Sequence, residues 1–376
     1  MLSFWDKKEF LHYDFIVVGA GITGLSTACE IKEQKPKATV MVLERGLLPT
    51  GASTKNAGFA CIGTLSEKVY DLGLMGKDAL LQLINNRITG LQLLRNRLGD
   101  DNIDYQNNGG FEMILKNNVK HHLDKLDEMN ELLFPLLNKN IFSENKKLVE
   151  QFGFNKNMVD TIICNDFEGQ IDTGKMMKNL INYCYSLGIH ITTGAIVNHI
   201  ESNSNVVKVM ATSNQTEYNF TCNKLAVCTN AFTGNLLNLD DITPGRGQVI
   251  CTTPIPNLKF KGTFNFDEGF YYFRDFENRI IFGGGRNLDF ETETTTEFGL
   301  NQKIIDKLVY YLKEIIIPDT AFIIEHKWSG IMAFGKNKLP VVKLVETNIV
   351  VGARLNGMGV ALGSKIAKDV VALMSI

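Results

Sequence analysis

The sequence predicts an α/β protein whose N-terminal part is a Rossmann-like, dinucleotide-binding βαβ unit, and three observations support this prediction. The first is a short apolar run at residues 13–18 that leads into three closely spaced glycines. The second is a helical pattern that follows the glycines and leads into another apolar run. The third is a length of 376 residues with 44% hydrophobic residues, which is enough to bury a large core and predicts two domains.

The glycines have the spacing of a turn that binds a pyrophosphate. Gly19 lets the chain turn tightly after the strand, Gly21 lets backbone N–H groups approach the phosphates, and Gly24 lets the helix pack closely on the strand. Ile22 and Thr23 lie at the start of this helix, whose positive dipole end faces the phosphates. We therefore expect these five residues to bind a cofactor.

Glu44 ends the second strand, twenty residues after Gly24. A carboxylate at this place accepts hydrogen bonds from an adenosine ribose and repels a 2′-phosphate. Arg45 follows directly, and we include it among the expected cofactor-binding residues.

A long loop of small residues follows at 47–63, where a nicotinamide dehydrogenase would continue into another helix. Long loops in compact domains are usually functional. Hydroxyl, amide and small residues suit this loop for wrapping a second face of the pyrophosphate and a flavin ring: Ser53, Thr54, Asn56, Ala57 and Gly58.

Two later segments favour the same cofactor. A buried strand at residues 225–228 leads into Thr229 and Asn230, and a strand, a glycine turn and a helix follow one another at 348–373. The N–H groups that open this last helix could stabilise negative charge on a reduced flavin. The residues expected there are Gly357, Met358, Gly359 and Val360.

Composition excludes several other classes of protein. A net charge of −2 indicates no attraction to nucleic acid or anionic lipid. Seven cysteines without a CxxC pair indicate free thiols, and six scattered histidines predict no metal site. The absence of a signal peptide and of a membrane-spanning run predicts a cytoplasmic protein, with peripheral attachment to an inner membrane left open.

The motifs VVGAGITGLSTA, VLERG, TGASTKNAG, RGQV, WSGI and GMGVALG together resemble the FAD-dependent D-amino acid oxidase superfamily. This superfamily includes glycine oxidase, sarcosine oxidase and gamma-glutamylputrescine oxidase, and the closing segment looks most like the last of these. The resemblance implies a Rossmann-like FAD-binding domain interleaved with an α+β substrate domain on a large mixed sheet. It implies FAD-binding segments at 1–105, 167–232 and 326–376, and substrate-binding segments at 106–166 and 233–325.

Within this frame, residues 109–116 and 246–253 are expected as strands, 269–285 as a hairpin, and 117–137 and 297–315 as helices. A capped helix is expected to begin after Asp172 or Thr173. Val197 matches the family position whose backbone contacts adenine.

The resemblance implies hydride removal from a carbon that bears an amine, giving an imine, with a small-molecule amine or amino acid as substrate. Oxygen or a quinone would then reoxidise the flavin. FAD is expected to be non-covalent, because no cysteine follows Cys251 in the region where sarcosine oxidase carries its linking cysteine.

One departure from the family concerns the substrate. Glycine oxidase and D-amino acid oxidase have a carboxylate-binding arginine shortly after W-x-G, where this chain has Met332. This favours an amine or a larger amino-acid derivative unless another arginine substitutes. Arg354 is the best-placed substitute, followed by Arg246, with Arg274 and Arg286 also open, and Tyr272 is expected to face the flavin.

Two alternatives remain on the same scaffold. An L-2-hydroxyglutarate-type hydroxy-acid oxidase or dehydrogenase would need a histidine near the flavin, for which His326 is the candidate. A non-catalytic FAD-binding protein, including one used in tRNA modification, is the other, although no basic stretch favours RNA binding.

Overall fold

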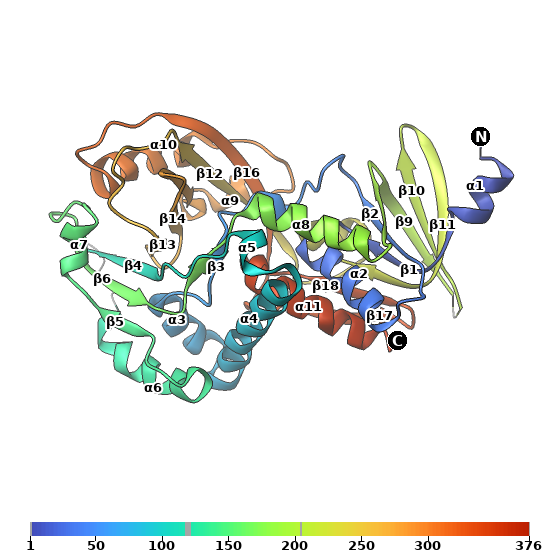
Figure 1. Ribbon diagram of the computed structural model, residues 1–376, viewed down its shortest axis with the longest axis horizontal. Helices are drawn as coiled ribbons and strands as arrows, with labels where there is room; N and C mark the ends of the chain where they lie inside the picture. The colour runs from blue at the N-terminus through green and yellow to red at the C-terminus, as the bar shows by residue number, and fades with distance from the viewer. Residues whose placement is uncertain (1, 117–121, 204, 376) are drawn as a thin grey trace.

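The computed structural model describes residues 2–116, 122–203 and 205–375, and these contain two eight-stranded sheets that occupy opposite ends of an elongated molecule (Figure 1). The mixed α/β class and the large mixed sheet agree with the sequence prediction.

The first sheet has a parallel centre. Its strands follow the order β17 (Val341–Glu346), β18 (Ile349–Ala353), β11 (Thr216–Val227), β1 (His12–Val18), β2 (Val40–Glu44) and β8 (His190–Thr193). All neighbours from β18 to β8 run parallel, and β17 adds an antiparallel edge. β10 (Val207–Ser213) and β9 (Ile196–Ser202) extend from β11 as an antiparallel ribbon.

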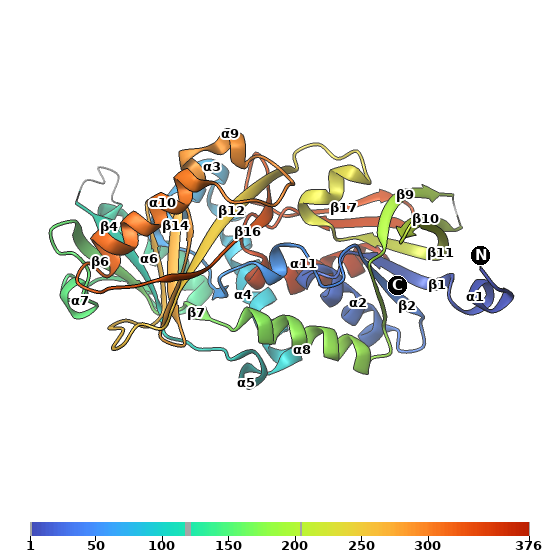
Figure 2. The ribbon, with the colours of Figure 1, turned by 90° about the horizontal axis from the view of Figure 1, so that it is seen from above.

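Strand β1 shows why this sheet is buried on both faces. Phe15 and Val17 pack in the core formed with the helices, whereas Ile16 and Val18 pack in the core formed with β9, β10 and β11. This follows from the alternation of side chains along a strand. The helices of the first core are α2 (Ile22–Gln34), α4 (Lys77–Leu98), α8 (Thr173–Ser186) and α11 (Gly359–Leu373), and Figure 2 shows α2 and α8 on the side opposite β9 and β10.

Glycines allow these helices to approach one another closely. A Cβ on Gly90 of α4 would lie 2.1 Å from the carbonyl oxygen of Ala361, and one on Gly363 of α11 would lie 2.6 Å from Cγ2 of Ile22. The starts of α2 and α11 are therefore held close to each other.

The second sheet carries an aromatic core. Its order is β16 (Ile324–Phe334), β12 (Thr243–Thr252), β15 (Arg279–Gly284), β14 (Tyr271–Phe276), β13 (Thr263–Phe266), β4 (Gly110–Leu115), β6 (Val159–Asn165) and β5 (Phe142–Glu144). Only β13 and β4 pair in parallel, which makes the sheet mixed. Helix α10 (Gln302–Tyr311) continues as a π-helical turn at Leu312–Ile316 and packs on this core.

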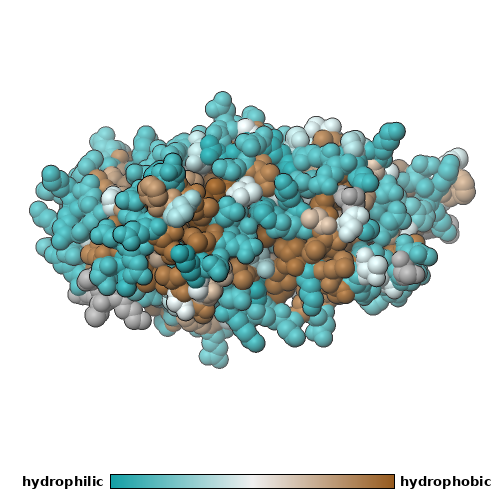
Figure 3. All heavy atoms as spheres, turned by 90° about the horizontal axis from the view of Figure 1, so that it is seen from below, coloured by the Kyte–Doolittle hydropathy of each residue, from teal (hydrophilic) through white to brown (hydrophobic). Residues whose placement is uncertain are grey.

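The remaining elements are short, apart from two helices that cover the second sheet: α3 (Leu65–Met75) and α6 (Leu126–Leu137). The others are α1 (Phe4–Glu9), α5 (Asp100–Ile103), α7 (Lys147–Gln151), α9 (Phe290–Glu293), β3 (Phe59–Ala60), β7 (Gly169–Gln170) and the single turns Ala52–Thr54, Leu123–Lys125, Asn230–Asn235 and Arg286–Leu288. In the part of the chain that is described, no helix has the length and apolarity needed to cross a membrane. The face shown in Figure 3 is largely hydrophilic, with apolar patches near its middle.

Most of the expected elements are present, with shifted ends. The predicted strands correspond to β4 and β12, and the hairpin corresponds to β14 and β15 with a two-residue turn at Glu277 and Asn278, both at positive φ. Asp172 caps α8 by accepting a hydrogen bond from the Lys175 N–H group. The helix predicted at 297–315 begins only at Gln302, and residues 117–121 of the other predicted helix lie outside the described residues. The predicted boundary at 326 falls inside β16, which belongs to the second sheet.

Candidate active site

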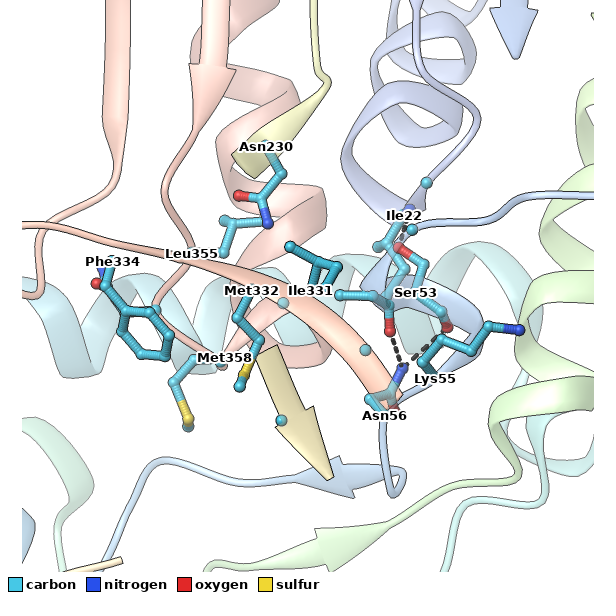
Figure 4. A pocket seen from close by; sticks show the side chains of 18 of the residues that line it. Ile22, Ser53, Lys55, Asn56, Asn230, Ile331, Met332, Phe334, Leu355 and Met358 are labelled. Carbon is cyan, nitrogen blue, oxygen red and sulfur yellow. Dashed lines mark hydrogen bonds between the residues drawn. The ribbon is translucent and has the colours of Figure 1, made fainter. Parts of the chain in front are cut away.

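A cavity of about 870 Å³ is lined by residues from both sheets and from the loops between them (Figure 4). One wall consists of the β1–α2 turn, the loop after β2 and the start of α11. The opposite wall comes from β12, β14, β16 and the turn after β15. The cavity therefore combines the predicted cofactor segments with the predicted substrate segments.

The β1–α2 turn has the backbone conformation that requires glycine. Gly19 has a φ of +103°, and a Cβ there would lie 2.8 Å from the carbonyl oxygen of Cys228. A Cβ on Gly24 would lie only 1.8 Å from the carbonyl oxygen of Gly19, so helix α2 packs directly on the turn. Gly21 is the N-cap of α2 and offers no side-chain cap, which leaves N–H groups for another partner.

Two polar groups at the start of α2 bear on which ligand this turn can bind: the Ile22 N–H group and the Thr23 hydroxyl. The Ile22 N–H group donates a hydrogen bond to Ser53 Oγ over 2.9 Å, which ties the loop after β2 to the helix (Figure 4). Thr23 Oγ1 is buried at the cavity and has no hydrogen-bond partner within the described residues. Buried hydroxyls are normally hydrogen-bonded, so this orphan atom fits a polar ligand at the helix start.

Glu44 fixes the turn from the other side. Its side chain is only 5% exposed, and Oε2 accepts a hydrogen bond from the Ala20 N–H group over 3.0 Å. Its other oxygen, Oε1, accepts from the Gly46 N–H group and from Thr50 Oγ1. The carboxylate therefore links the end of β2 to the glycine turn and to the loop that follows, while it still lines the cavity.

The loop after β2 is held by its own side chains. Asn56 Nδ2 donates to the Ser53 carbonyl oxygen, and Asn56 Oδ1 accepts from the Gly58 N–H group and from Thr173 Oγ1. The Arg45 guanidinium lies 3.7 Å from the centre of the Phe232 ring. These contacts hold the loop after β2 in place along the cavity wall.

The start of α11 provides a second helix N-terminus at the cavity. Gly357 has a φ of +79°, and Met358, the N-cap, makes no side-chain cap. Asn230 Oδ1 accepts a hydrogen bond from the Arg354 N–H group, so the strand–turn–helix unit is anchored to the segment after β11. The helix N–H groups that remain free can stabilise negative charge.

The wall from the second sheet is mainly apolar. Ile331, Met332 and Phe334 of β16 line it (Figure 4). Val249 of β12 lines it as well. Tyr272 of β14 lies edge-to-face against Phe59 at 5.7 Å, and burial raises the pKa of its hydroxyl to about 12. The neighbouring Tyr271 points into the aromatic core, as strand alternation predicts.

The expected roles of Arg354 and Arg246 do not match their positions, because neither side chain lines the cavity. The Arg354 guanidinium donates to the Leu339 carbonyl oxygen and to Asn337 Oδ1, and it pairs with Asp241. Arg246 donates two hydrogen bonds of 2.9 Å to Glu293.

The other two candidate arginines differ from each other. Arg274 donates to the carbonyl oxygens of Gly58 and Ile171, away from the cavity. Arg286, in contrast, lines the cavity, and its guanidinium carbon lies 4.0 Å from the centre of the Phe334 ring. In the sequence, Arg286 directly follows three glycines at a strand end and precedes Phe290 by four residues, but no pattern indicated its contact with Phe334 of β16.

No histidine lines the cavity in the described part of the chain. His326, the candidate for a hydroxy-acid oxidase, has a side chain that is 67% exposed and lies beside Glu325. Its place on β16 turns it to solvent, so the expectation of a histidine near the flavin is not met at this residue.

A buried charged cluster adjoins the cavity and was missed by the sequence analysis. Glu67 pairs with Arg87 at 2.9 Å, and Lys338 pairs with Asp71 at 2.8 Å, joining α3, α4 and the loop after β16. Burial lowers the pKa of Lys68 in the same cluster to about 8. The charged residues at 67, 68 and 71 look like an exposed helix face in the sequence, so no pattern indicated this cluster.

Most of the predicted cofactor residues line the cavity, including Val197, Thr229, Asn230 and the start of α11. The three that do not are Gly24, Thr54 and Gly58. Gly24 sets the packing of α2, Thr54 Oγ1 donates to the Pro49 carbonyl oxygen, and Gly58 has a φ of +79° with its N–H group on Asn56. Their assignment as contact residues remains a prediction.

Comparison with known proteins identifies the family. A family model described as FAD dependent oxidoreductase matches residues 14–373. The fold is similar to glycine oxidase from Geobacillus kaustophilus, with a TM-score of 0.78 and 17% identity over 97% of this chain and 95% of that chain. It is also similar to L-proline dehydrogenase from P. horikoshii, with a TM-score of 0.75 and 14% identity over 97% and 94%. Iminodiacetate oxidase from Chelativorans sp. BNC1 gives a TM-score of 0.72 and 16% identity over 95% of each chain. No curated protein matches the chain in a sequence search.

Proposed function

The chain belongs to the family of FAD-dependent oxidoreductases, and from this membership we propose that it oxidises the carbon–nitrogen bond of an amine or amino acid to an imine. Bound FAD supplies the acceptor for the two electrons of this oxidation. The names of three structural neighbours, glycine oxidase, L-proline dehydrogenase and iminodiacetate oxidase, support an amino-acid or amine substrate.

The residues at the cavity fit FAD in this proposal. The glycine turn and the start of α2, with its unpartnered Thr23 hydroxyl, would hold the pyrophosphate. Glu44 would face the ribose, and the start of α11 would lie at the electron-rich edge of the flavin. The first sheet would form the FAD-binding domain, and the second sheet, with β16 included, would form the substrate domain.

The lack of a histidine in the described cavity wall is the observation that carries the choice of an amine. Alcohol oxidation needs a base to take the hydroxyl proton, whereas an amine that arrives neutral needs none. The Tyr272 hydroxyl, with its raised pKa, stays protonated at neutral pH and would position the substrate rather than accept a proton. The apolar residues Val249, Ile331 and Met332 would keep water from the reacting carbon.

Anaerobic mixing of the purified holoprotein with amines, N-methyl amino acids, D-amino acids and hydroxy acids tests this proposal. We expect amines or amino acids to bleach the flavin absorbance and air or a quinone to restore it. Bleaching by hydroxy acids alone would contradict the proposal. Bound FAD that neither class reduces would indicate a binding protein.

A further inference from the structure

We propose that the substrate carries a carboxylate remote from the oxidised carbon–nitrogen bond, and that Arg286 binds this carboxylate. The inference rests on the proposed function, since it names the substrate class of the same cavity. It differs from the expectation for a simple α-amino acid, in which the carboxylate and the amine share one carbon.

Arg286 is a planar cation that packs against two aromatic rings. It opens the short helical turn Arg286–Leu288 after β15 and lines the cavity. Its guanidinium carbon lies 4.0 Å from the centre of the Phe334 ring and 4.8 Å from that of the Phe290 ring. Aromatic rings that cover the faces of a guanidinium leave its N–H donors free at the edges. Such a fork suits two parallel hydrogen bonds to one carboxylate.

The protein provides no counter-ion for Arg286 within the described residues. Glu293, the acidic group that acts on it, already accepts hydrogen bonds from Arg246, Gln248 and Asn301. Burial lowers the pKa of Arg286 despite the opposing effect of Glu293, as expected for a cation that is partly removed from water and only partly compensated. An anionic ligand would supply the missing partner.

Strand β16 determines how far this cation lies from the reacting end. Met332 and Phe334 line the cavity from one face of β16, whereas Ile331 and Ala333 pack together with Ala231. Met332 and Phe334 are therefore successive positions on the same face of the strand. Met332 is the one beside the glycine turn of α11, because its Sδ would lie 3.5 Å from a Cβ on Gly357. Phe334, and Arg286 stacked on it, lie one strand repeat further along, which is about 7 Å.

A substrate that reaches from the glycine turn to Arg286 must span this repeat. An extended chain covers about 7 Å in roughly six bonds. The inference therefore favours amines with a distal carboxylate over α-amino acids.

The other charges of the wall are compatible with an anion. Lys55 and Lys336 add positive charge to the lining. The described lining contains three carboxylates. Backbone N–H groups hold Glu44 and Arg87 pairs with Glu67, so Glu268 is the carboxylate whose charge is not balanced in this way.

The first test measures binding without turnover. Straight-chain monocarboxylates from acetate to octanoate are titrated into the oxidised holoprotein, and the perturbation of the flavin spectrum gives each Kd. We expect the longer acids to bind more tightly than their neutral amides. R286L should weaken the longer acids by about a hundred-fold or more, the size of two lost charge-assisted hydrogen bonds, and leave the amides unchanged. R286K should fall between, because lysine keeps the charge but loses the planar fork.

The second test follows flavin reduction by ω-amino acids of increasing length, from glycine to 6-aminohexanoate, with alkylamines of the same length as controls. We expect the longer amino acids to be preferred in the wild type and the preference over alkylamines to vanish in R286L. M332R, which moves a cation beside the glycine turn, should shift the preference toward the shorter amino acids.

The outcomes separate this inference from the proposed function. Equal carboxylate binding by wild type and R286L would overturn the inference, as would equal reduction by alkylamines and amino acids in the wild type, and in both cases amine oxidation could stand. Arg286-dependent carboxylate binding without reduction by any amine would support the carboxylate site and overturn amine oxidation.

Discussion

Replacement of Gly24 by alanine tests the close packing of helix α2 on the glycine turn. The new Cβ would lie 1.8 Å from the Gly19 carbonyl oxygen, whereas real Cβ atoms do not come closer than 3.0 Å to such an atom. The helix start must therefore withdraw by about 1.2 Å, the difference between these two distances. Because the obstacle is backbone and not a flexible side chain, relaxation cannot be confined to one rotamer.

The cost can be compared with a matched glycine. Overpacking against an unyielding neighbour costs roughly 3 kcal/mol, at the upper end of the usual range, and alanine regains about 1 kcal/mol of helix propensity. We expect G24A to lower the free energy of unfolding by about 2 kcal/mol. Gly73 of α3 has no atom within 4 Å of its Cβ position, so G73A should gain up to about 1 kcal/mol.

Urea unfolding of both variants measures the stabilities, and quenching of FAD fluorescence on titration into the apoproteins measures cofactor affinity. A helix start displaced by about 1.2 Å lengthens every hydrogen bond from its N–H groups to a ligand, so G24A should bind FAD at least about tenfold more weakly. G73A should bind it as the wild type does. If G24A matches G73A in both stability and FAD affinity, the reasoning about this turn is wrong.

Three other predictions concern pH, the cofactor loop and the linkage of FAD. Burial raises the pKa of Glu168 from 4.5 to about 7, so its contribution to stability is full below pH 4.5 and is lost as the pH rises through 7. The free energy of unfolding of E168Q should therefore rise relative to that of the wild type by up to about 3 kcal/mol between pH 4.5 and 8. Urea unfolding at several pH values measures this difference, and a difference that stays constant with pH would refute the prediction. N56A removes the hydrogen bonds of this side chain to Gly58, Thr173 and Ser53, so FAD should bind about tenfold more weakly, as measured by fluorescence titration. S186A, at the exposed end of α8, is the control and should bind FAD as the wild type does. Acid precipitation should release all the FAD into the supernatant, since burial raises the pKa of both cavity thiols, Cys61 and Cys228; flavin retained in the pellet would show a covalent link.

The residues on the cofactor side of the cavity could be predicted from the sequence, because each turn that forms this side consists of a few consecutive residues. The turn at Gly19, Gly21 and Gly24 and the turn before α11 each depend on a few consecutive residues whose backbone geometry allows few alternatives. Family and fold followed from these segments, and both are confirmed.

The substrate side could not be read in the same way, because its residues come together only through tertiary structure. Arg354 follows a strand that leads to the cofactor turn, yet Asp241 and two loop carbonyl groups from elsewhere in the chain hold its guanidinium. Arg286 lies beside Phe290, only four residues later, but its closer ring is that of Phe334, which comes from the distant strand β16. Asp71 is fully buried and Glu67 mostly so, and both pair with Lys338, which comes from a distant loop.

The pairing of β1 has a consequence for how the protein is made. His12 pairs with Thr221, 209 positions later, and β11 in turn pairs with β18 near the C-terminus. During synthesis β1 and β2 therefore emerge long before the strand that completes their sheet, and α11 emerges last. Parallel strands with distant partners form slowly and expose apolar surface meanwhile. We expect the nascent chain to depend on chaperones until β18 and α11 have left the ribosome, and a chain truncated before β18 to aggregate instead of yielding a smaller folded protein.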